Sequence, residues 1–320
     1  MILKFICSSI FSIFFFTAVS ANTFSSSARP DSSAGNSSSG DREVALILNQ
    51  IQGKRLPESL EIVSAHFLGR KYQLGPLGEG NLGKYNQNPL FRLDRFDCTT
   101  LIETTMALAT AKTSKDFEMQ INRIRYHHAQ MSYVDRNHFP ELDWIPNNER
   151  AGLIRDITAE VASPGKAEIA HGLINKPAWY AHKQISEVIV PSAPLAQKQK
   201  LLSELRNEGA NFRPETASLP YLGFDSLFKG KNPNFPNEEL LGKIPSGTIV
   251  NLVREKWYLP KAGTELLISH QGLAIRKKDA LYFRNASSSD AVVEDLPFAA
   301  YLAELIHNPT VVGINLLEVR

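Results

Sequence analysis

The sequence has few cysteines and almost no excess of charge of either sign. Its 320 residues include only two cysteines, and 35 basic residues nearly balance 33 acidic ones. A nearly neutral chain offers no electrostatic reason to bind nucleic acid or an anionic membrane. With 43% hydrophobic residues, it can still bury a substantial core, in one large domain or two smaller halves.

The apolar run at residues 5–16 is too short for a comfortable membrane span. Lys4 precedes this run, and small residues at 19–21 provide a cleavage site. This pattern predicts a signal peptide at residues 1–21, followed by a flexible Ser- and Gly-rich spacer at 22–41. We therefore expect a periplasmic or secreted protein with no stable membrane insertion after cleavage.

Recognisable pairs of metal ligands are absent as well. No H-x-x-E-H pattern occurs, and the eight histidines are scattered along the chain. The adjacent pair His127 and His128 would point in different directions on a helix, which makes a poor metal site. A zinc amidase is therefore disfavoured, and we expect neither a metal nor another cofactor.

Cys98 is the only cysteine left once the predicted signal peptide, with Cys7, is removed. An exported protein with one thiol cannot use it for an intramolecular disulfide. An unpaired thiol in an oxidising compartment is a liability unless it is buried or needed. A buried core cysteine is the simpler interpretation, and a catalytic cysteine becomes the better one once partners for the thiol are found.

The residues around Cys98 predict the start of a helix. Apolar residues follow at helical spacing, with Glu103 and Lys112 free to face water. Asp97 can cap this helix, and Thr100 and Glu103 also have the spacing of a capping box, so two starts are possible. In both cases the thiol lies near a helix N-terminus, where free N–H groups and the helix dipole favour the thiolate.

The order of the predicted elements indicates an α+β fold. We place a mainly helical subdomain with the nucleophile at residues 42–240, and an antiparallel, barrel-like β subdomain at 241–320. Within the first, residues 150–245 show no pattern that assigns a role. The predicted helices cover 42–51, 57–68, 98–112 and 114–128, and the predicted strands cover 249–253, 266–275, 281–285 and 311–319.

His270 lies in the second predicted strand and Asn285 ends the third. Alternation places His270 on one face with Gly272 and Ala274, whose small size leaves open space over the imidazole. A four-residue hairpin loop at 276–279 pairs His270 with Asn285, so that the amide oxygen accepts from one ring nitrogen. A three-residue loop moves Asn285 to the other face, and a buried core histidine remains the alternative interpretation.

An oriented imidazole on a strand, together with a thiol at a helix N-terminus, is the arrangement of cysteine acyl-transfer enzymes. Two irregular segments are candidates for the borders of such a site. Residues 70–95 form a long Gly- and Pro-containing stretch that either lines the site or only connects elements. Residues 137–146, bounded by prolines, form either a surface loop or a recognition loop for a sugar or peptide.

Three motifs resemble the NlpC-type papain-like cell-wall cysteine hydrolases, and more closely their N-acetylmuramoyl-L-alanine amidase-like branch. They are Phe-Asp-Cys-Thr-Thr at 96–100, Ser-His-Gln-Gly-Leu-Ala-Ile at 269–275 and Asn-Ala-Ser at 285–287. The resemblance covers roughly residues 45–320. It implies a papain-like fold in which Cys98 is the nucleophile, His270 the base and Asn285 the residue that orients the imidazole.

The same resemblance implies that Tyr72, Asp97, Asp143 and Trp144 border the substrate. It implies peptidoglycan or a muropeptide as that substrate, with hydrolysis of the amide between N-acetylmuramic acid and L-alanine. We expect the enzyme to act as a monomer. Two other functions stay open, namely an endopeptidase that cuts within the stem peptide, for example after γ-D-glutamate, and a non-catalytic cell-wall-binding protein.

Overall fold

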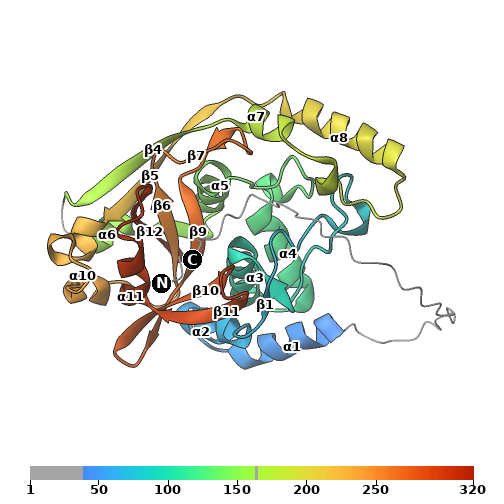
Figure 1. Ribbon diagram of the computed structural model, residues 1–320. Coiled ribbons are helices and arrows are strands. Elements are labelled where there is room, and N and C mark those ends of the chain that lie inside the picture. The colour runs from blue at the N-terminus through green and yellow to red at the C-terminus, as the bar shows by residue number, and fades with distance from the viewer. Residues whose placement is uncertain (1–38, 163–164) are drawn as a thin grey trace, which may run out of the picture.

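The computed structural model describes residues 39–162 and 165–320 (Figure 1). The predicted signal peptide and most of the predicted spacer lie outside these residues. The last three residues of that spacer are already helical, because the first helix begins at Ser39.

Helices and strands alternate irregularly along the chain. The helices are α1 (Ser39–Ile51), α2 (Leu56–His66), α3 (Cys98–Thr110), α4 (Ser114–Arg125), α5 (Ile145–Arg150), α6 (Thr158–Val161), α7 (Lys176–Ala181), α8 (Leu195–Gly209), α9 (Phe224–Leu227), α10 (Glu238–Gly242) and α11 (Phe298–Leu305). Short 3-10 or π turns are η1 (Gly80–Leu82), η2 (His127–Ala129), η3 (Pro140–Trp144), η4 (Ile185–Glu187) and η5 (Lys229–Lys231).

The strands belong to one large sheet and one small hairpin. The large sheet contains β1 (Lys71–Tyr72), β2 (Arg95–Phe96), β3 (Ile154–Asp156), β4 (Ala167–Ile174), β5 (Glu215–Gly223), β6 (Thr248–Arg254), β9 (Ile268–Lys277), β10 (Ala280–Ser287), β11 (Val292–Pro297) and β12 (Val311–Val319). The hairpin contains β7 (Tyr258–Leu259) and β8 (Thr264–Glu265).

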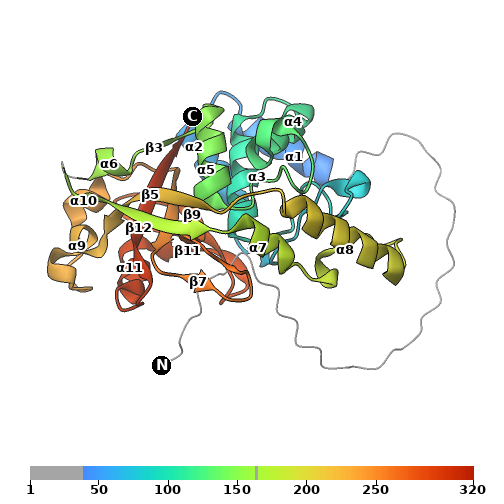
Figure 2. The same cartoon turned by 90° about the horizontal axis from the view of Figure 1, so that it is seen from above.

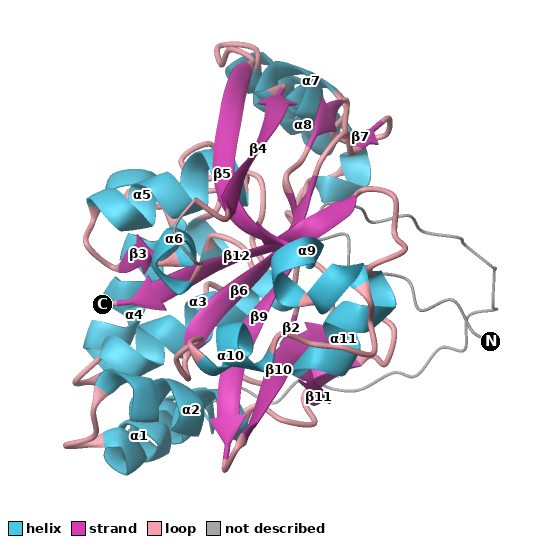
Figure 3. Cartoon of the chain, turned by 90° about the vertical axis from the view of Figure 1, so that its left-hand side faces the viewer, coloured by secondary structure: helices cyan, strands magenta, loops and turns pink. Residues whose placement is uncertain are grey.

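The large sheet is mixed and curled, and it forms the middle layer of the described chain (Figure 3). Its strand order is β2-β1-β11-β10-β9-β6-β12-β5-β4, and β3 pairs with β12. The pair of β1 and β2 is parallel, whereas the long central strands pair antiparallel. The central strands β9 and β10 come from the last part of the chain. They face the cysteine helix α3, which belongs to the first half of the chain.

The central strands of the sheet are buried on both faces. Every residue of β6 is buried, and its side chains alternate between two apolar cores. Ile249 and Val253 pack with residues of α1 to α4, whereas Val250 and Leu252 pack with residues of α9 to α11. Figures 2 and 3 show these two groups of helices on opposite sides of the sheet. Burial on both faces explains why the sequence of β6 is a nearly continuous run of apolar residues.

The α+β class and most of the predicted elements are confirmed. The four predicted helices correspond to α1 to α4, and the four predicted strands correspond to β6, β9, β10 and β12. The strands β4 and β5 were missed, so the sheet extends into the part that was predicted to be mainly helical. Pro220 within β5 and Gly172 within β4 disfavour strand prediction, because neither residue strengthens a sheet interior.

The predicted register of the β9–β10 hairpin is wrong. Lys277 pairs with Ala280, so the loop has two residues, and Lys278 in this loop has a φ of +52°. The ladder continues to Leu273 paired with Arg284. Asn285 is thus displaced by two residues from the predicted pairing with His270. Because side chains alternate with a period of two, Asn285 still shares a face with His270.

Candidate active site

Cys98 is the first residue of α3, and Asp97 is its N-cap. The Asp97 Oδ1 atom accepts from the Thr100 N–H at 2.8 Å, and the Asp97 N–H donates to Thr100 Oγ1 at 2.9 Å. This reciprocal pair decides between the two predicted helix starts. Cys98 has 0% exposure, and its Sγ lies 3.9 Å from Thr99 Oγ1.

The second carboxylate oxygen of Asp97 holds the irregular segment at 70–95. The Gly75 N–H donates to Asp97 Oδ2 at 2.9 Å. Further along this segment, a Cβ on Gly78 would lie 2.4 Å from the side-chain oxygen of Asn86, so only glycine allows this close approach. The segment is therefore a border of the site, which decides between the two interpretations of residues 70–95.

His270 and Asn285 form the predicted hydrogen bond. The distance between His270 Nε2 and Asn285 Oδ1 is 2.9 Å, and both side chains are buried. Because an amide oxygen only accepts, Nε2 carries the hydrogen in the neutral imidazole. Nδ1 then holds the lone pair, and it has no hydrogen-bond partner among the described residues. In this tautomer Nδ1 is the ring nitrogen that does not carry a hydrogen.

The space beside His270 is filled, contrary to the expectation from its small neighbours. The Phe283 ring packs edge-on against the imidazole with 5.7 Å between ring centroids. A Cβ on Gly272 would lie 2.4 Å from Phe283 Cε2, so this glycine makes room for the aromatic ring. The imidazole is consequently held by packing on one side and by the Asn285 amide on another.

A β-bulge precedes His270. Leu252 of β6 pairs with His270, whereas the next residue, Val253, pairs with Ile268, so Ser269 is the extra residue on β9. Bulges bend a strand and redirect its side chains, and they are frequent beside active sites. Strict alternation along residues 266–275 could not reveal this feature.

A hydrogen bond joins the cysteine helix to the histidine strand. Thr99 Oγ1, next to Cys98, donates to Gln271 Oε1, next to His270, at 2.8 Å. Gln271 Nε2 in turn donates to Asn251 Oδ1 at 2.8 Å, and both amides are buried. Gln271 stands where the resembling family usually has an apolar residue, and it was not among the predicted site residues. The available signal was a polar side chain within an apolar strand pattern.

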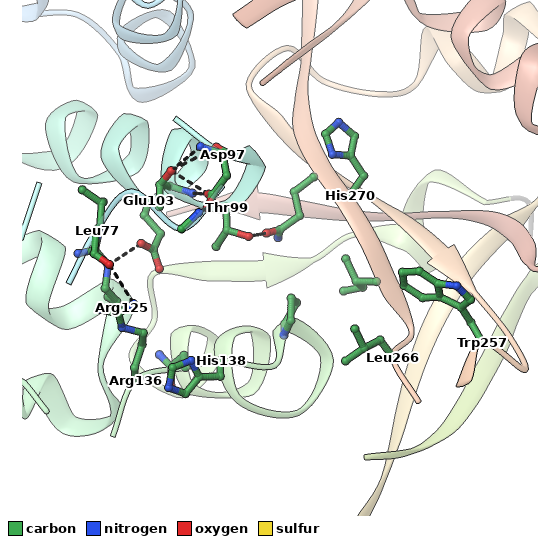
Figure 4. Close-up of a pocket in the computed structure, with 16 residues that line it drawn as sticks. Leu77, Asp97, Thr99, Glu103, Arg125, Arg136, His138, Trp257, Leu266 and His270 are labelled. Atoms are coloured by element: carbon green, nitrogen blue, oxygen red, sulfur yellow. Dashed lines mark hydrogen bonds and ion pairs between the residues drawn. The ribbon is translucent and has the colours of Figure 1, made fainter. Parts of the chain in front are cut away.

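These segments surround a cavity of about 140 Å³ (Figure 4). Asp97, Thr99 and His270 lie at its middle, and Figure 4 shows Arg125 and Arg136 at one end and Trp257 at the other. Pockets that enclose a whole small-molecule ligand usually measure about 300–1,000 Å³. A cavity of this size suits the groups on the two sides of one bond in a larger substrate.

One end of the cavity is charged. Glu103 is buried and accepts from Arg125 Nε at 2.7 Å, so the expectation that Glu103 faces water is wrong. Arg136 pairs in the same way with Glu79 at 2.5 Å. Arg125 Nη2 and Arg136 Nε are buried without a hydrogen-bond partner among the described residues. This end of the cavity is therefore lined by two guanidinium groups that are each held by a buried carboxylate. The nearby His138 stays neutral, because burial lowers its pKa well below the usual range.

The four predicted substrate-binding residues occupy different places. Asp97 lines the cavity. Asp143 accepts from Lys176 Nζ at 2.5 Å, and burial raises the pKa of Asp143. Tyr72 lies on β1 beside Phe96 of β2. Trp144 is fully buried, so its indole has no face open to a ligand, contrary to the expectation that it borders the substrate. The aromatic residue that lines the cavity is Trp257.

Two further findings concern the described part of the chain. Its helices are too short or too polar to cross a membrane. It also lacks any group of three or more His, Cys, Asp or Glu side chains placed to hold a metal ion.

Fold and cavity together define an α+β protein in which Asp97 and Thr99, the neighbours of the helix-borne Cys98, line one cavity with His270, whereas Cys98 itself is buried beside it. The chain belongs to the AmiA-like family, described as N-acetylmuramoyl-L-alanine amidase-like, whose model matches residues 62–309. This confirms the amidase-like part of the resemblance, and it identifies a hydrolase family with a peptidoglycan-type substrate. The wider NlpC-type, papain-like assignment stays a prediction.

Several solved structures are similar to this chain. A protein of Legionella pneumophila from the DUF1460 family is 35% identical, with a TM-score of 0.84, covering 88% of this chain and 94% of that one. An N-acetylmuramoyl-L-alanine amidase of Bacteroides uniformis is 20% identical, with a TM-score of 0.59. The match covers 83% of this chain and 99% of that one. A protein of Bacteroides fragilis described as a putative xylanase is 22% identical, with a TM-score of 0.57. The match covers 80% of this chain and 99% of that one. The last two show the fold alone. No curated protein matches the chain.

Proposed function

We propose that the protein is an exported, papain-like cysteine amidase that hydrolyses the bond between N-acetylmuramic acid and L-alanine in peptidoglycan or muropeptides. Cys98 is the nucleophile, His270 the base and Asn285 the residue that orients the imidazole. The observation that carries the proposal is the bond from His270 Nε2 to Asn285 Oδ1, which leaves Nδ1 as the basic atom beside the cavity. The family description supports the choice of substrate.

In the proposed reaction, His270 Nδ1 takes the thiol proton of Cys98, and the sulfur attacks the carbonyl carbon of the muramoyl lactyl group. Backbone N–H groups at the start of α3 stabilise the oxyanion, at about 3 kcal/mol per donor. The imidazolium then returns the proton to the amine of L-alanine as the C–N bond breaks. Water, deprotonated by His270, hydrolyses the remaining thioester and restores the thiol.

The hydrogen bond between Thr99 and Gln271 supports this pairing of helix and strand. It joins the residue after Cys98 to the residue after His270 at 2.8 Å. The capping box at Asp97 supports the same proposal, because it fixes the first turn of α3 and leaves N–H groups of that turn available at the cleft.

The proposal is tested with muropeptides of defined structure and product identification by mass spectrometry. We expect free N-acetylmuramoyl sugar and an intact peptide from the wild-type protein, and no products from Cys98→Ala. A chelator should leave the activity unchanged. Activity that survives Cys98→Ala and disappears with the chelator would refute the cysteine mechanism.

Two alternatives have distinct outcomes in the same experiment. An endopeptidase would cut within the stem peptide, for example after γ-D-glutamate, and would depend on the same three residues. A non-catalytic cell-wall-binding protein would retain muropeptides without any product. The oriented base at His270 favours a catalytic role over binding alone.

A further inference from the structure

Trp257 occupies the end of the cavity opposite the two arginines (Figure 4). It lies in the connection from β6 to β7, and its side chain is partly exposed. Leu266 and Ile268, just before His270, line the cavity with it. The backbone fixes this neighbourhood, because the Leu266 N–H donates to the Trp257 carbonyl at 3.4 Å. This end of the cavity is therefore flat, aromatic and apolar.

Arg254 holds the indole through a cation–π contact. Its guanidinium carbon lies 4.4 Å from the centroid of the Trp257 ring, and Arg254 is not a lining residue. Arg254 is buried and donates to Asn308 Oδ1 at 3.2 Å and to Thr310 Oγ1. A cation held over an aromatic face attracts the ring. The indole is thereby placed before any ligand arrives.

The two ends of the cavity suit different chemistry. The guanidinium groups of Arg125 and Arg136 line one end, and their positive charge suits the carbonyl and carboxylate groups of a peptide. Trp257 offers a flat ring, which suits the C–H face of a pyranose sugar. The proposed scissile bond joins a sugar-bearing lactyl group to a peptide, so the substrate has the same two-part chemistry as the cavity.

We infer that Trp257 stacks on the muramoyl sugar ring, with the peptide stem directed toward Arg125 and Arg136. This inference rests on the proposed function and extends it to the orientation of the substrate. It makes Trp257 a residue that determines selectivity for a sugar-bearing substrate over a free acyl peptide.

The test compares two substrates that share one peptide, with N-acetylmuramoyl on one and only D-lactyl on the other. We expect Trp257→Ala to raise KM about tenfold for the muramoyl substrate, the effect of one lost stacking contact. The kcat/KM for the lactyl peptide should stay unchanged. Trp257→Phe should retain most of the affinity, because it keeps an aromatic ring. Tyr258→Ala is the matched control, since Tyr258 is the next aromatic residue and does not line the cavity.

An equal loss on both substrates would overturn the inference, because it indicates a structural role or a peptide contact. An unchanged KM on both substrates would overturn it as well. Calorimetric binding of the muramoyl peptide to the Cys98→Ala protein separates this inference from the proposed function. Binding that weakens with Trp257→Ala supports the inference even if the wild-type protein shows no cleavage. If the wild-type protein cleaves the expected bond but binding does not depend on Trp257, the proposed function stands and the inference about Trp257 is wrong.

Discussion

At the scale of single residues, the hydrogen bond between His270 and Asn285 has the most direct consequence for the proposed mechanism. The amide oxygen fixes both the ring orientation and the tautomer, although it adds no charge. The chain thus uses a neutral group to orient the imidazole. Its contribution should appear in the rate of the chemical step and not in substrate affinity.

We expect Asn285→Ala to lower kcat about 100-fold with little change in KM, since general acid–base catalysis contributes about 10²–10⁴-fold. Steady-state kinetics on a muropeptide measure this split. Asn285→Gln provides the conservative comparison, because it keeps an amide but moves it by one methylene. A thermal transition unchanged in the Ala variant confirms that the fold is intact. A rise in KM with an unchanged kcat would contradict the orienting role.

Glu141 is a buried carboxyl group outside the proposed mechanism. It lies in the π turn η3 and accepts from the Leu267 N–H at 3.1 Å. Burial raises its pKa to about 7 from an ordinary value of 4.5. The folded protein therefore keeps this proton between about pH 4.5 and 7, while the unfolded chain loses it. The contribution of Glu141 to the free energy of unfolding is complete below pH 4.5, and it is lost as the pH rises to 7.

The variant Glu141→Gln should remove this dependence, because an amide mimics the protonated acid. A shift from 4.5 to about 7 corresponds to about 3 kcal/mol in the free energy of unfolding. Urea unfolding at several pH values between 4.5 and 8 measures the effect. We expect the wild type to lose stability relative to the variant as the pH rises. Parallel curves for the two proteins would contradict the assignment.

At the scale of elements, the start of α3 combines a structural and a functional task. Asp97 caps the helix that carries Cys98 and also binds the segment at Gly75. The helix α4 offers a comparison, since Thr113 caps it by accepting from the Asp116 N–H. The two caps use the same physical interaction at different distances from the cleft.

We expect both Asp97→Ala and Thr113→Ala to destabilise the fold by about 1 kcal/mol or somewhat more, the usual value of an N-cap. Only Asp97→Ala should also lower kcat/KM, because it releases the first turn of α3 and the loop at Gly75. Asp97→Asn should restore much of the stability, since an amide oxygen can still accept. Equal losses of activity in the two cap variants would show that general destabilisation is responsible.

At the scale of the whole molecule, Arg284 joins the sheet to the helical layer that carries the cysteine. It is buried and donates to both oxygens of Asp295 on β11, each at 2.7 Å. Its third nitrogen donates to Ser64 Oγ of α2 at 2.9 Å. One residue of β10 thus connects the neighbouring strand with a helix that precedes Cys98 in the chain.

Removal of one partner of this pair should be costly. We expect Asp295→Ala to destabilise the protein by about 3–5 kcal/mol, because it leaves the guanidinium charge buried without its partner. Chemical unfolding measures the loss. The double variant Arg284→Met with Asp295→Leu should recover much of this stability, since it removes both charges. A double variant as unstable as the single one would show that packing around β10 and not charge is responsible.

Local patterns in the sequence were sufficient for several features of this protein. The helix that begins near Cys98, the apolar runs of β6, β9, β10 and β12, and the α+β class follow from capping, periodicity and order along the chain. These depend on neighbours within a few residues. The motifs around Cys98 and His270 also indicated the amidase-like family that residues 62–309 match.

Other features depend on contacts between distant residues, and only the tertiary structure decided them. The two-residue loop at Lys278, the bulge at Ser269 and the buried pair of Glu103 with Arg125 have no local signal. The same holds for Trp144 and Trp257, since either tryptophan could have faced the substrate. Burial depends on how the sheet curls and which helices cover it. The packing of distant segments therefore placed Trp144 in the core and Trp257 at the cavity.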